Sequence, residues 1–67
     1  MRYFINKRPQ LNWDHEVHIL NCNRLPSKDN LEYLWDFLSC RQAVQEAKKR
    51  YPKADGCAHC CPTCHKS

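Results

Sequence analysis

The sequence lacks a long apolar run. Residues 1–9, MRYFINKRP, contain no apolar segment of the kind that a secretory signal peptide requires. No other stretch of the chain approaches the roughly 20 apolar residues of a transmembrane helix. We therefore predict a cytoplasmic protein that does not associate with membranes.

The chain is also too short to bury a large hydrophobic core. Its 67 residues predict a single domain, residues 1–67. A domain of about this size buries only about 60% of the surface that its unfolded chain exposes. The six cysteines are therefore candidates for a stabilising cross-link. Bound metal is the interpretation that fits a cytoplasmic protein, and a set of disulfides is the alternative for a secreted one.

Two short motifs at opposite ends of the chain supply metal ligands. The first is His18-x-x-x-Cys22, and the second is Cys57-x-x-Cys60, which directly follows Gly56. Together they offer three thiolates and one imidazole, a set of donors that binds Zn²⁺ tetrahedrally. We predict that His18, Cys22, Cys57 and Cys60 bind one zinc ion. A structural histidine at position 18 without metal is the alternative.

The other cysteines and histidines leave the set of ligands open. Cys61, Cys64, His59 or His65 could each replace a predicted ligand. Cys40 could instead form a disulfide with Cys64. The spacing of these residues along the chain does not decide between these possibilities.

Two further patterns involve the same C-terminal segment. Residues 61–65 match the C-x-x-C-H pattern of c-type haem attachment. No export signal accompanies the pattern, and Met1 is the only methionine, so no distal methionine ligand is present. Cys57 and Cys60 have the spacing of a thioredoxin-like redox pair, but a proline and more cysteines follow where that motif would begin a helix. We disfavour both interpretations.

Three strands and one helix are predicted. Residues 2–6 and 15–20 form strands, and the loop between them permits a long hairpin. Residues 21–30 are rich in Asn, Pro and Ser and form a loop. The apolar positions of residues 31–37 fit a strand or a helix, and the aromatic enrichment favours a strand.

The helix has clear boundaries. Ser39 and Gln42 form a capping box, so the helix begins near Cys40. Pro52 ends it near Arg50, because the residue before a proline is disfavoured in the α region. The predicted fold is α+β: a short antiparallel three-stranded sheet packed by one helix, with a zinc knuckle at the C-terminus.

The order of these motifs along the chain is informative. A hairpin ends in Val-His-x-x-x-Cys-x-x-Leu, an Asn precedes an aromatic strand, and Phe-x-Ser-x-x-x-Ala-x-x-x-Ala and Gly-Cys-x-x-Cys follow. This order resembles the zinc-binding domain of the Ada methylphosphotriester repair proteins. The matching residues are Val17, His18, Cys22, Leu25, Asn30, Phe37, Ser39, Ala43, Ala47, Gly56, Cys57 and Cys60. The resemblance implies the same four zinc ligands and a nucleic-acid partner.

The first ligand departs from the pattern of that family. In the Ada domain it is a cysteine that accepts a methyl group from DNA phosphate, whereas this chain has His18. An imidazole ligand is not the nucleophilic zinc thiolate that this transfer requires. The chain is more similar to short Ada-like domains with a His-x-x-x-Cys pair. We therefore predict a structural zinc ion and no enzymatic activity.

The charge suggests a partner. The net charge is +4, and Lys48, Lys49, Arg50 and Lys53 cluster near the end of the predicted helix. A solvated helix end would explain this cluster, and a surface that contacts the phosphates of DNA or RNA is the sharper hypothesis. We predict a monomeric, nucleic-acid-binding zinc module. A protein-interaction module is the alternative function, and a thiol-based redox or metal-responsive switch is the second alternative.

Overall fold

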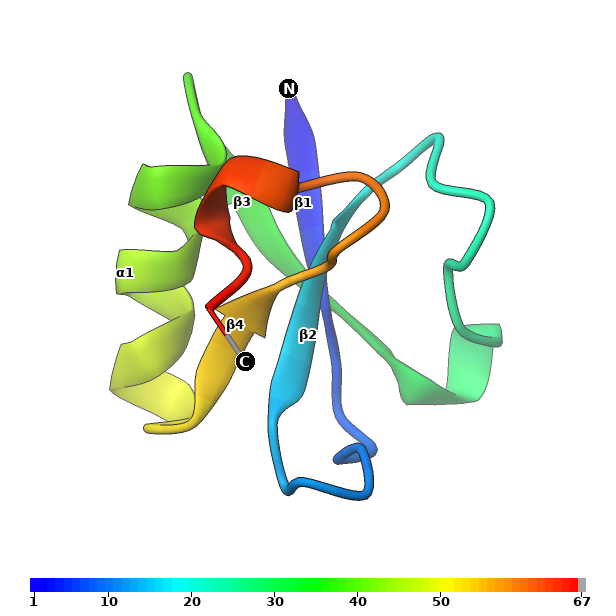
Figure 1. Ribbon diagram of the computed structural model, residues 1–67. Coiled ribbons are helices and arrows are strands. Elements are labelled where there is room, and N and C mark those ends of the chain that lie inside the picture. Colours follow the sequence, from blue (N-terminus) through cyan, green and yellow to red (C-terminus); the bar gives the residue numbers. More distant parts are fainter. Residues whose placement is uncertain (67) are drawn as a thin grey trace.

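The computed structural model describes residues 1–66, which form an α+β fold with one α-helix and a four-stranded sheet (Figure 1). No helix within these residues is long and apolar enough to cross a membrane. The elements in chain order are β1 (Arg2–Asn6), β2 (His15–Ile19), η1 (Lys28–Asn30), β3 (Leu31–Asp36), α1 (Cys40–Arg50), β4 (Ala54–Gly56) and η2 (Pro62–Cys64), where η denotes a 3₁₀ helix.

The sheet has one more strand than the sequence predicted. Its order is β3-β1-β2-β4, with β1 antiparallel to both β2 and β3. The fourth strand, β4, pairs in parallel with β2, so the sheet is mixed and not wholly antiparallel. A strand of three residues is too short to show an alternating pattern. It forms here because the chain after α1 returns beside β2.

Helix α1 covers one face of the sheet, and the connection between β2 and β3 lies on the other side (Figure 1). Large side chains of the sheet meet small side chains of the helix in the core between them. Ala43 and Ala47, the buried residues of α1, are small and allow the helix to lie close to the sheet. The buried core residues are Tyr3, Ile5, Val17, Leu34, Ala43, Ala47, Ala54 and Cys61.

The structure confirms the predicted start of the helix after Ser39, although the return bond of the capping box involves Leu38 and not Ser39. Ser39 Oγ accepts a hydrogen bond from the Gln42 backbone N–H at 3.5 Å. The Gln42 side-chain oxygen accepts one from the Leu38 backbone N–H at 3.0 Å. The helix ends at Arg50, as predicted, where Tyr51 before the proline adopts an extended conformation. The predicted strands 15–20 and 31–37 each end one residue earlier in the structure.

A disulfide connects the helix to the C-terminal segment. Cys40 at the start of α1 is bonded to Cys64 in η2, which is one of the pairings that the sequence left open. Stable disulfides are rare in cytosolic proteins, so this bond does not favour the cytoplasmic location, which stays a prediction. Further contacts hold the segment against β4, because the Lys66 N–H donates to the Asp55 carboxylate.

Candidate metal centre

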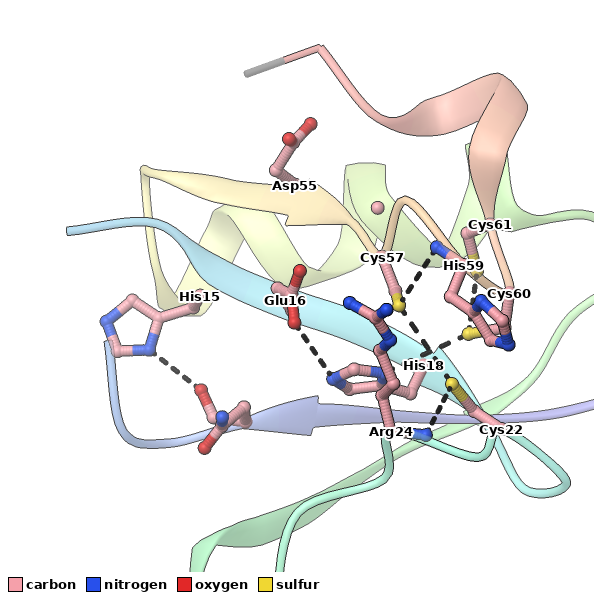
Figure 2. A network of polar contacts seen from close by, with 12 residues as sticks. His15, Glu16, His18, Cys22, Arg24, Asp55, Cys57, His59, Cys60 and Cys61 are labelled. Carbon is pink, nitrogen blue, oxygen red and sulfur yellow. Dashed lines mark hydrogen bonds and ion pairs between the residues drawn. The ribbon is translucent and has the colours of Figure 1, made fainter. Parts of the chain in front are cut away.

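Four side chains from the two predicted motifs converge at one point (Figure 2). One ligand atom from each of His18, Cys22, Cys57 and Cys60 lies within 4.8 Å of the others. The Cys22 and Cys57 sulfurs are 3.9 Å apart. Sulfurs bound tetrahedrally to zinc at about 2.3 Å are separated by about 3.8 Å. The four residues are therefore close enough to hold a metal ion.

Backbone pairing brings the two motifs together. The parallel pairing of β2 with β4 continues beyond Gly56, because the Cys57 N–H donates to the Val17 carbonyl at 3.0 Å. This bond places Cys57 beside His18. A turn then reverses the chain, as the Cys61 N–H donates back to the Cys57 carbonyl at 2.8 Å. The turn that carries Cys57 and Cys60, which we call the knuckle, is thus fixed to the end of β2.

Gly56 is required by the close approach of the chain to itself. A Cβ atom at this position would lie 2.7 Å from Cys64 Cβ and 2.9 Å from the Cys61 carbonyl oxygen. Both distances are shorter than side chains tolerate. The glycine therefore lets the segment that carries η2 lie directly against the start of the knuckle.

Each of the three sulfurs accepts one backbone N–H. Hydrogen bonds to the charged form of a group favour that form, so these donors stabilise thiolates. Two of the donors lie two residues after the cysteine that they contact, which is a consequence of the tight turns. The donors are Arg24 for Cys22, His59 for Cys57 and Ile19 for Cys60, each with a nitrogen–sulfur distance of 3.4 Å.

His18 is only 1% exposed and presents its two ring nitrogens to different neighbours. Nδ1 lies 3.9 Å from the Cys60 sulfur, and Nε2 lies 3.5 Å from Glu16 Oε1. The second contact is an ion-pair distance but not a hydrogen bond, and Nε2 has no hydrogen-bond partner within residues 1–66. Burial lowers the pKa of His18, and the Glu16 carboxylate opposes this shift. A neutral imidazole is the form that binds metal.

The carboxylate of Glu16 completes this arrangement. Glu16 and His18 alternate with buried Val17 on β2 and so point to the same face of the sheet. Histidines that bind metal usually donate their second N–H to a carboxylate or carbonyl, which fixes the orientation of the ring. Glu16 lies where it could accept that N–H after a small movement.

The alternative ligands lie outside this group of four. Cys64 is bonded to Cys40, and the His65 ring contacts Asp55 and the Gly56 carbonyl. Cys61 is a buried core residue whose sulfur lies 3.9 Å from that of Cys60.

Burial affects the two adjacent thiols at the end of the knuckle. It raises the pKa of Cys60, and the Ile19 N–H partly opposes this shift. Burial also raises the pKa of Cys61, against the hydrogen bond from Cys60. A divalent cation bound to Cys60 would favour its thiolate form, because a thiol that coordinates a metal loses its proton. Cys61 belongs to the hydrophobic core, where its thiol does not need a negative charge.

The four predicted phosphate-binding cations differ in their contacts. Three of them contact other groups of the chain. The contacts are Lys49 with Glu46 at 3.1 Å, Arg50 with Glu32, and Lys53 with the Asn12 carbonyl at 3.0 Å. Lys48 borders a shallow hollow that Lys66 also lines. The nucleic-acid contacts of these four cations stay a prediction.

Comparisons of the chain with protein-family models, with curated proteins and with solved structures find no match. The metal centre is therefore inferred from the geometry of the chain itself. The resemblance to the Ada domain stays an inference from the motifs.

Proposed function

We propose that this chain is a small binding module whose fold is stabilised by one structural Zn²⁺. The observation that supports it is the convergence of one imidazole and three sulfurs within 4.8 Å. Four protein ligands fill a tetrahedral zinc site and leave no position for a substrate, which is typical of structural sites. Thiolate and imidazole donors favour zinc over the hard cations magnesium and calcium.

Nucleic acid is the partner that we propose for this module. The net charge of +4 and the resemblance of the motifs to the Ada zinc domain support this choice. Methyl transfer is not part of the proposal, because the position of the methyl-accepting cysteine is occupied by His18. The buried imidazole fits a ligand that holds the fold together.

Metal analysis of the purified protein tests the zinc site. We expect one zinc per chain, and removal of zinc by a chelator should collapse the dispersed NMR spectrum, because the free energy of metal binding contributes to folding. Cys22→Ser and Cys57→Ser should each abolish stoichiometric zinc. The matched control is Cys61→Ser, which changes an adjacent buried thiol outside the cluster. Zinc retained by Cys57→Ser but lost from Cys61→Ser would show that the ligands are assigned wrongly.

A thiol-based switch is the second candidate function. The observation that favours it is the 3.9 Å separation of the Cys22 and Cys57 sulfurs, which is close enough for oxidation to a disulfide. Two thiolates, one hydrogen peroxide and two protons would give one disulfide and two waters, and the zinc ion would be released. Release of zinc by peroxide, reversed by a reductant and added zinc, would support this function. Zinc that stays bound under peroxide would exclude it.

A further inference from the structure

The face of the sheet opposite α1 carries a row of three aromatic rings. Phe4 on β1 contacts Tyr33 on β3 with ring centroids 5.4 Å apart, and Tyr33 contacts Trp35 at 5.7 Å. Phe4 is half-buried, whereas Tyr33 is 40% exposed and Trp35 is 63% exposed. We call these three residues the aromatic row. The three rings contact one another and so form one patch, whereas exposed apolar residues that are scattered singly need no explanation.

A β-bulge positions the last ring of the row. Phe4 is opposite Tyr33 and Tyr3 is opposite Trp35, so Leu34 is an additional residue in β3. Leu34 stays in the core, and the bulge leaves Trp35 on the outer face beside Tyr33. The backbone of Trp35 has a φ of 150°, which residues with side chains rarely adopt. Strained backbone and bulges are concentrated at functional sites, where they direct a side chain to its task.

The aromatic row begins beside the metal centre, and Arg2 lies on the same face. Phe4 is directly opposite His18 in the β1–β2 pair, so the two side chains share a face. Arg2 precedes Phe4 by two residues, is exposed, and lies on the same face by the alternation of the strand. Arg2 is opposite Asp36 in the β1–β3 pair. A phosphate backbone that runs beside the row would therefore meet a cation at Arg2.

We propose that the aromatic row binds single-stranded nucleic acid, with bases stacked on Tyr33 and Trp35 and the phosphate backbone contacted by Arg2. This inference rests on the proposed function and identifies its surface and its ligand. Bases of a single strand can stack on aromatic side chains, and such stacking tolerates any sequence because every base has a π face. Bases inside a duplex are already stacked on one another. Sheets that present aromatic residues bind single-stranded RNA in this manner.

Fluorescence polarisation with labelled oligonucleotides tests the proposal. The zinc-loaded protein is titrated with oligodeoxythymidine, with oligouridine and with a DNA duplex of the same length. We expect tighter binding to single strands than to the duplex. Trp35→Ala should weaken binding of single strands by about 5-fold to about 150-fold, the range for loss of one stacked base. Trp35→Phe, which keeps a ring, should restore part of the affinity.

Trp13→Ala is the matched control. Trp13 is 69% exposed in the loop between β1 and β2 and lies outside the aromatic row. The Trp13→Ala substitution should leave the affinity unchanged. Circular dichroism and zinc content should show that Trp13→Ala and Trp35→Ala both fold. Equal loss of affinity in Trp13→Ala and Trp35→Ala would overturn the proposal, because it would indicate non-specific hydrophobic contact.

The same titrations separate this inference from the proposed function. If the duplex binds best, Trp35→Ala has no effect and Lys48→Ala with Lys49→Ala weakens binding, then the helix end is the interface and the aromatic row is not. If no nucleic acid binds the zinc-loaded protein at low salt, then both the row as proposed and the nucleic-acid function are wrong. The structural zinc module would remain in that case, with its own test in the metal analysis.

Discussion

The disulfide between Cys40 and Cys64 should account for a large part of the stability of this domain. We consider the double variant Cys40→Ser/Cys64→Ser, which removes the cross-link and leaves the four candidate zinc ligands in place. Both cysteines lie outside the metal cluster. The variant therefore separates the effect of the covalent bond from that of the metal.

The magnitude follows from the length of chain that the bond closes. The two cysteines are 24 residues apart in sequence. On a chain-entropy model, a cross-link over a loop of about this length destabilises the unfolded state by about 3.5 kcal/mol. A domain of this size has a total stability on the order of 3–10 kcal/mol. Loss of the bond should therefore lower the midpoint of thermal unfolding by ~15–25 °C.

Thermal and urea unfolding, followed by circular dichroism with saturating zinc, measures this effect. A reductant is the matched control, because it should lower the midpoint of the wild type to that of the double variant and leave the variant unchanged. Equal midpoints for the oxidised wild type and the variant would refute the reasoning. Loss of zinc from the folded variant would also contradict it, since the bond would then act on the native metal centre and not on the unfolded chain.

Two further changes test other parts of the structure. Gly56→Ala adds a methyl group 2.7 Å from Cys64 Cβ and should destabilise the domain by about 1–3 kcal/mol in urea unfolding, so an unchanged midpoint would contradict the close approach. Glu32→Gln removes a carboxylate whose pKa is lowered, first by its hydrogen bond from Arg50 and also by that from Tyr51. The stability contributed by this lowered pKa is fully present above the unfolded pKa of about 4.3 and is lost as the pH falls through the folded pKa. The stability difference between wild type and Glu32→Gln should therefore shrink on acidification, and a difference that is constant with pH would exclude this origin.

The amino-acid sequence alone determined the elements whose signals are local. The helix was predicted from Cys40 to Arg50 because Ser39, Gln42 and Pro52 fix its two ends within a few residues. The strand Arg2–Asn6 was also predicted with its observed bounds. The two motifs also indicated which four side chains would lie close enough to hold a metal ion, because each motif has a spacing that one turn can present to a metal.

Tertiary structure decided the features that depend on segments far apart in the chain. Strand β4 has three residues and forms through its parallel pairing with β2, which no local pattern encodes. The spacing of the cysteines did not show whether Cys60 or Cys61 would lie beside the other three candidate ligands, or that Cys40 pairs with Cys64. Packing of the folded chain brings Cys60 into the cluster, buries Cys61 in the core and places the start of α1 beside η2. The physical reason is that the conformation of a short segment depends on its neighbouring residues. Cys22 and Cys57 are 35 residues apart, and His18 and Cys60 are 42 residues apart. Whether such distant residues meet depends on the packing of the whole sheet and helix.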